Sequence, residues 1–72
     1  MNTLNFEFEF EFANATIICT CLHFFACASS EYEIRIIANN REQKSILTHI
    51  GIFESEYEVC ANLYEKWLNK EI

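Results

Sequence analysis

The segment from Phe6 to Phe12 alternates strictly between phenylalanine and glutamate, and it restricts the fold more than any other part of the chain. Successive side chains of a β-strand point to opposite faces, so a strand places the phenylalanine rings on one face and the carboxylates on the other. A helix would scatter both sets around its axis. The pattern predicts a half-buried antiparallel strand over residues 4–13. Its phenylalanine face should cover a core, and its glutamate face should meet water or a basic partner.

Three further segments have the composition of strands. Residues 16–27 are rich in β-branched and aromatic side chains and are apolar on both faces, which is typical of a central strand, although a helix over 16–28 remains an alternative. Residues 31–38 alternate, with Tyr32, Ile34 and Ile36 on one face and Glu31, Glu33 and Arg35 on the other. Residues 45–53 form the fourth expected strand.

Short polar segments separate these strands. Turns are predicted at Asn14-Ala15, Ser29-Ser30 and Asn39-Asn40, because asparagine tolerates the left-handed conformation that tight hairpins need. The polar run over residues 41–44 is expected to widen the last of these loops. Gly51 is expected to mark a bulge or a close backbone approach in the fourth strand.

After residue 54 the apolar period changes from two to between three and four. Ser55 and Glu58 fit a capping box, in which the serine hydroxyl accepts from the backbone N–H of Glu58 and the glutamate reaches back. The apolar stripe of the predicted helix comprises Tyr57, Cys60, Ala61, Tyr64, Trp67 and Leu68. The chain is therefore expected to form a single α+β domain over residues 1–72. In it, a four-stranded antiparallel meander precedes one C-terminal amphipathic helix packed on one face, ββββα.

One helix covers only one face of such a sheet. Because 16–27 and part of 45–53 are apolar on both faces, the other face is expected to expose apolar surface, which is a mark of association. A chain of this length buries only about 60% of the surface that its unfolded form exposes. Homodimerisation or docking on a partner is therefore expected rather than a free monomer.

The chain is acidic, with eleven glutamates, no aspartate, five lysines and arginines, and a net charge of −6. This balance disfavours direct binding to nucleic acid and to anionic membranes. The single glycine excludes glycine-rich phosphate loops. Residues 12–30 carry no charge, but their acidic lead-in and interspersed polar residues fit neither a signal peptide nor a membrane span. A cytoplasmic location with free thiols is expected.

Cysteine and histidine suggest a metal site only weakly. Cys19, Cys21 and His23 alternate and would share a strand face, which Cys27 and Cys60 could join. Residues two apart in a strand hold their Cα atoms roughly 6.5 Å apart, too far for easy chelation without a bulge. Free cysteines also pack as small hydrophobic side chains. No metal and no cofactor are predicted.

Catalysis is not expected either. A dyad of Cys21 and His49 would require the second and fourth strands to be neighbours, and nothing in the sequence supplies a third group or an oxyanion loop. A domain of this size also has little room for an ordinary ligand pocket. The sequence therefore predicts no enzyme and no catalytic residue.

The glutamates form the candidate site. Same-face carboxylates of a strand repeat at roughly 7 Å, close to the separation of successive phosphates along a nucleic-acid strand. Such an array would attract and block the basic groove of a nucleic-acid-binding protein. In the plainer interpretation, exposed glutamates keep a phenylalanine-rich edge strand soluble. The residues predicted to bind a partner are Glu7, Glu9, Glu11, Glu31, Glu33, Glu54, Glu56 and Glu58.

Small size, acidity and the lack of catalytic motifs are the profile of many phage-encoded inhibitors of bacterial defence nucleases and of small immunity proteins. This is an analogy of profile and not of residues. We expect a non-catalytic inhibitor or adaptor that docks on a basic surface of a larger protein. In the most specific form of this hypothesis, the partner is a nucleic-acid-binding complex and the chain is an anti-defence nucleic-acid mimic. The alternatives are a homodimeric structural module and, third, a thiol-based metal binder.

Overall fold

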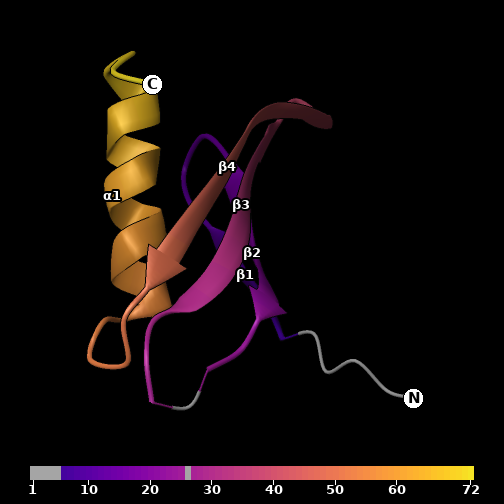
Figure 1. The fold of residues 1–72 in the computed structure, drawn as a ribbon. Helices are drawn as coiled ribbons and strands as arrows, with labels where there is room; N and C mark the ends of the chain where they lie inside the picture. Colours follow the sequence, from indigo (N-terminus) through magenta and orange to yellow (C-terminus); the bar gives the residue numbers. More distant parts are fainter. Residues whose placement is uncertain (1–5, 26) are drawn as a thin grey trace.

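The computed structural model describes residues 6–25 and 27–72, which form four strands followed by one helix (Figure 1). The strands are β1 (Glu7–Glu11), β2 (Thr16–His23), β3 (Ser30–Ala38) and β4 (Arg41–Ile50), and the helix is α1 (Glu56–Leu68). Each strand pairs antiparallel with its predecessor, giving the order β1-β2-β3-β4. The predicted ββββα meander is confirmed.

The strand register assigns every side chain to one of the two faces. Phe8 lies opposite Cys19, and Cys19 lies opposite Ile34, so these side chains share a face. The intervening row, which contains Glu9 and Ile18, points to the other face. Figure 1 shows α1 along one side of the sheet. We call the side packed against α1 the covered face and the opposite side the open face.

The core lies between the covered face and α1. Alternate residues of β2 and β3 are buried because the period of two delivers each of them to the same side. Cys60 and Tyr64 are the buried residues of α1, which lies nearest to β1 and β2. The apolar core consists of Ala15, Ile17, Cys19, Cys21, Tyr32, Ile34, Ile36, Ala38, Ile50, Cys60 and Tyr64.

The phenylalanine row of β1 bridges the edge of the sheet and the helix, as the alternation predicts. The Phe12 ring stacks on Tyr64 with 4.5 Å between centroids, and the Phe10 ring meets Tyr57 edge-on at 5.4 Å. Phe10 and Phe12 are partly buried against the core, while Phe6 and Phe8 are exposed to 40% and 38%. The row is thus buried only at the end that α1 reaches.

Helix α1 begins as the sequence predicts, but its buried face is rotated. Ser55 is the N-cap, and its hydroxyl accepts from the Glu58 N–H at 3.3 Å. Tyr57 and Leu68 of the predicted stripe are exposed. The packed face comprises Val59, Cys60, Leu63, Tyr64 and Trp67. Tyr64 belongs to both faces, and its hydroxyl accepts from the backbone N–H of Asn14 at 3.0 Å, which fixes α1 to the β1–β2 turn.

Several strand boundaries differ from the prediction, among them the end of β4, which lies at Ile50 and not at Phe53. The β1–β2 turn is centred on Ala13 and Asn14, closed by a hydrogen bond from the Phe12 N–H to the Ala15 carbonyl, and Ala15 is buried. Strand β2 ends at His23, so the connection to β3 is longer than expected. The polar run over residues 41–44 does not widen a loop, because it belongs to β4. Residues 4 and 5 of the predicted first strand lie outside the described part of the chain.

The β3–β4 hairpin is closed by Asn39 and Asn40, both in the left-handed region with φ of 55° and 60°. Two successive positive φ values are the signature of a type I′ turn. We expect Asn39→Ala to lower the free energy of unfolding by about 1 kcal/mol, since alanine tolerates this conformation poorly. Asn40→Gly should be neutral or stabilising, because Asn-Gly is the preferred type I′ pair. Urea denaturation followed by circular dichroism tests both, and an equal loss for the two variants would contradict this account.

Candidate binding surfaces

Carboxylates from β1 and β3 gather on the open face. Glu7 lies opposite Thr20, which in turn lies opposite Glu33, and Glu9 continues the β1 row. The alternation of β3 puts Glu31 on the same face as Glu33. The carboxylates along β1 repeat at roughly 7 Å, and β1 and β3 are two strand spacings, about 10 Å, apart. The register thus places together five of the eight predicted residues: Glu7, Glu9, Glu11, Glu31 and Glu33.

Short contacts hold part of this acidic array. The Thr20 hydroxyl donates to Glu7 Oε2 at 3.1 Å, and Arg35 Nη2 lies 3.5 Å from the same oxygen. The Ser45 hydroxyl donates to Glu33 Oε2 at 2.9 Å. Glu9 and Glu11 make no ion pair or side-chain hydrogen bond with other described residues and are exposed. Arg35 therefore offsets the negative charge of Glu7 at one end of the β1 row. The charges of Glu9 and Glu11 remain available to a basic group.

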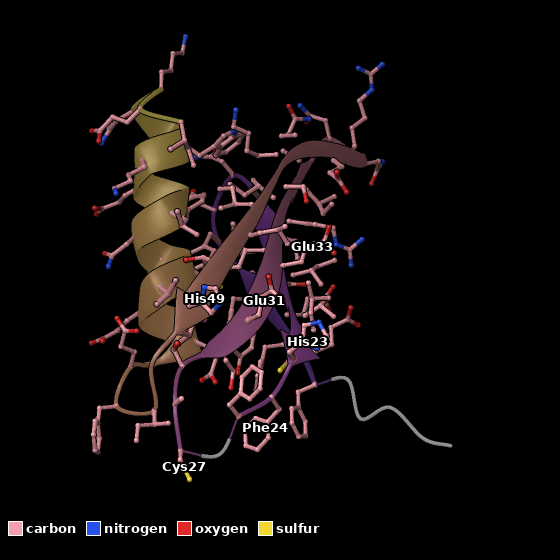
Figure 2. All side chains as sticks on the ribbon, viewed as in Figure 1. His23, Phe24, Cys27, Glu31, Glu33 and His49 are labelled. Carbon is pink, nitrogen blue, oxygen red and sulfur yellow. The ribbon has the colours of Figure 1, made fainter. Side chains whose placement is uncertain are left out.

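Two histidines flank Glu31 on the open face. A bulge at Leu22 shifts the β2 register, so His23 pairs with Glu31, and His49 of β4 pairs with Glu31 from the other side. The His23 Nε2 atom lies 3.7 Å from Glu31 Oε1. Figure 2 labels His23, Glu31 and His49, together with Glu33. The expectation that His23 shares a face with Cys19 and Cys21 is wrong, because the alternation rule breaks at the bulge, which has no signature in the sequence.

The remaining three predicted glutamates lie elsewhere. Glu56 accepts from the Tyr32 hydroxyl at 2.9 Å on the covered side of the sheet. Glu54 accepts from the Gly51 N–H at 2.6 Å, and Glu58 lies exposed in the first turn of α1. The bulge or close backbone approach predicted at Gly51 within the fourth strand is wrong, because Gly51 follows β4 and its nearest neighbour is the Glu54 side chain, 3.2 Å from a Cβ placed there. The eight residues therefore form two groups on different sides of the domain.

The open face exposes less apolar surface than expected. Its apolar members Ile18 and Ile37 are half-buried among polar neighbours, and Leu47 is the exposed one in β4. The larger apolar surface lies at one end of the sheet, where Phe6 and Phe24 meet edge-on with 5.5 Å between ring centroids. Sequence reasoning missed this end because it assigned residues 24 and 25 to a strand.

A cleft of about 340 Å³ opens at this end of the sheet, between the β2–β3 loop and the segment that leads into α1. Figure 1 shows these two connections side by side at the lower end of the molecule, and Figure 2 labels Phe24 there. We call it the end cleft. It is lined by Phe24, Phe25, Ala28, Ser30, Tyr32, Ile50, Gly51, Ile52, Glu54 and Glu56.

Three of the cysteines are buried inside the domain, and a fourth is exposed. The Cys60 thiol of α1 interacts with Cys19 of β2, and this contact together with burial raises the Cys19 pKa. The same contact lowers the pKa of Cys60, because Cys19 can donate to its thiolate. Burial raises the pKa of Cys21. Cys27 is exposed in the β2–β3 loop. The three buried thiols pack as core side chains.

Within residues 6–25 and 27–72, no three His, Cys or acidic side chains come together as ligands for a metal ion. In the same part of the chain, no helix has both the length and the apolar character needed to cross a membrane. No protein-family model, curated protein or solved structure significantly matches the chain. The fold and its surfaces are therefore the basis for a functional proposal.

Proposed function

We propose that this domain is a non-catalytic binding protein that docks the acidic open face of its sheet onto a basic surface of a larger protein. One observation carries the proposal: five carboxylates from two strands lie on the face opposite the one that α1 covers. Negative charges gathered on one face repel one another, so the arrangement lowers stability unless cations offset the charge. A basic partner would offset it.

The most specific form of this proposal is nucleic-acid mimicry. The exposed end of the β1 row presents Glu9 and Glu11 at roughly 7 Å, close to the spacing of phosphates along a strand. A nucleic-acid-binding protein with a basic groove would then be occupied by this chain instead of its own ligand, which is the action of an inhibitor. Glu54, Glu56 and Glu58 take no part in this surface.

We expect E9Q/E11Q to weaken partner binding roughly tenfold, since each removes an exposed charge pair of up to about 1 kcal/mol and leaves the side-chain shape unchanged. The matched control is E65Q/E71Q, which removes the same charge from exposed positions of α1 and the C-terminus. The measurement is affinity capture from native cell lysate at several salt concentrations, followed by calorimetry with the purified partner. Binding should also lose part of its salt dependence in E9Q/E11Q.

If E9Q/E11Q and E65Q/E71Q reduce the amount of captured partner equally, binding depends only on net charge, and the docking proposal fails. If neither variant changes the amount of captured partner, the interface lies outside the acidic open face, and the proposal also fails. If nothing is captured, the alternative is the homodimeric module, for which the exposed apolar side chains at the end of the sheet are the supporting observation. Light scattering then decides, because a dimer has twice the mass of 8.5 kDa.

A further inference from the structure

The end cleft is built from two connections that differ in chemistry. The β2–β3 loop contributes Phe24 and Phe25, and the segment from the end of β4 to the first residue of α1 contributes Ile52 and two carboxylates, those of Glu54 and Glu56. A cleft of about 340 Å³ is within the range of ligand sites, typically 300–1,000 Å³. This end of the domain lies away from Glu9 and Glu11 and takes no part in the acidic open face.

The apolar walls of the end cleft are exposed far beyond what a closed core allows. Phe24, Phe25 and Ile52 are 59%, 51% and 54% exposed, and the neighbouring Phe53 is 96% exposed. Phe6 extends the same surface through its contact with Phe24. Monomeric proteins seldom gather large apolar side chains in this way unless the surface binds something. The patch also continues past the cleft, so a ligand that only filled the cleft would leave much of it in water.

The carboxylates of the end cleft are held in place, and each keeps a free oxygen. Glu54 uses Oε1 to accept from the Gly51 N–H, and Glu56 uses Oε2 to accept from the Tyr32 hydroxyl. Neither makes an ion pair with another described residue. A cation that entered the cleft could therefore pair with oxygens that are already oriented, at little cost in side-chain entropy.

From this combination we infer that the end cleft binds an extended segment of a partner protein in which an apolar side chain stands beside an arginine or lysine. The apolar side chain packs against Phe24, Phe25 and Ile52, and the cation pairs with Glu54 and Glu56. The extent of the patch around Phe53 favours a polypeptide over a small amine, and the two carboxylates favour it over a second copy of this acidic chain. This second binding site goes beyond the acidic open face and stands or falls independently of it.

The test is a titration of the full chain with two capped peptides that differ in one charge, Ac-Leu-Phe-Arg-NH2 and Ac-Leu-Phe-Glu-NH2, followed by amide chemical shifts. We expect shifts at Phe24, Phe25, Ile52 and Glu54, and about tenfold tighter binding of the arginine peptide. E54Q/E56Q should weaken that peptide about fivefold, because glutamine keeps an oxygen for the Gly51 and Tyr32 donors but loses the charge. E58Q/E65Q, with the same loss of charge outside the cleft, should bind like the natural chain.

Several results would overturn the inference. Equal affinity for the two peptides would show that the carboxylates do not contribute to binding. Chemical-shift changes only outside the end cleft, or no changes at all, would show that the end cleft is not the binding site. Phenethylamine binding as tightly as the arginine peptide would make this a small-amine site. Shifts that depend on protein concentration without peptide would identify a second copy as the occupant. E9Q/E11Q should retain full peptide binding, so failure of the open-face proposal remains distinguishable.

Discussion

Replacing Ile34 by alanine should lower the free energy of unfolding by about 3–4 kcal/mol, because it removes a fully buried side chain and leaves a cavity. Ile34 lies in central strand β3, opposite Cys19 on one side and Ile46 on the other. The sheet gives the cavity little freedom to collapse, since both neighbours are fixed by the strand ladder. A domain of this length has only about 4–11 kcal/mol of stability, so the variant should be marginal.

The matched control is Ile37→Ala in the same strand. Ile37 lies half-buried on the open face, so the same truncation should cost only about 1 kcal/mol. Urea unfolding followed by Trp67 fluorescence and circular dichroism gives both values. The difference between the two variants measures how unequal the two faces of the sheet are. Similar losses for Ile34→Ala and Ile37→Ala would mean that the core does not lie on the side of α1.

The features that could be predicted from sequence are those set by a regular period. Strict alternation in β1 and β3 fixed which side chains face the core, and the change of period after residue 54 located α1 and its Ser55 cap. The Asn39-Asn40 turn followed from the left-handed tolerance of asparagine. In each case the local pattern and the global fold impose the same requirement, so sequence alone was enough.

The features that could not be predicted are those where the period is interrupted or tertiary contacts decide. The bulge at Leu22 puts His23 on the open face, and a run of apolar residues carries no sign of it. The buried face of α1 is set by contacts with residues far away in the chain, such as the hydrogen bond between Tyr64 and Asn14, fifty positions apart. Tertiary contacts also divide the eight glutamates into two groups. Glu54 accepts from Gly51 and Glu56 accepts from Tyr32, and these hydrogen bonds hold both carboxylates away from the open face.

Alkaline pH should destabilise this domain through two buried groups of the covered face, Tyr32 and Cys21. Burial, and then the hydrogen bond to Glu56, raise the pKa of Tyr32 above its ordinary value of 10.0. Burial raises the pKa of the Cys21 thiol above 9.0 in the same way. Both groups are neutral when protonated, so the folded state holds these protons more tightly than the unfolded chain does. Their contribution to stability is fully present below the ordinary pKa values and is lost as pH rises from these values through the raised pKa values of the folded state.

We therefore expect the free energy of unfolding to fall from about pH 9 upward, with Tyr32 contributing about 1.4 kcal/mol per pH unit above its ordinary pKa. Tyr32→Phe isolates this contribution. At pH 7 the substitution should lower the free energy of unfolding by about 1 kcal/mol, because the hydrogen bond to Glu56 is lost. Above pH 10 the free energy of unfolding of this variant should fall less steeply with pH than that of the natural chain. Tyr57→Phe, at an exposed position of α1, is the control and should keep the steep decline. Urea unfolding at intervals from pH 7 to 11 measures the free energy of unfolding of all three proteins.

If the free energy of unfolding of Tyr32→Phe falls as steeply with pH as that of the natural chain, the buried tyrosine is not the group that responds. The contact between β3 and α1 is then weaker than its geometry implies.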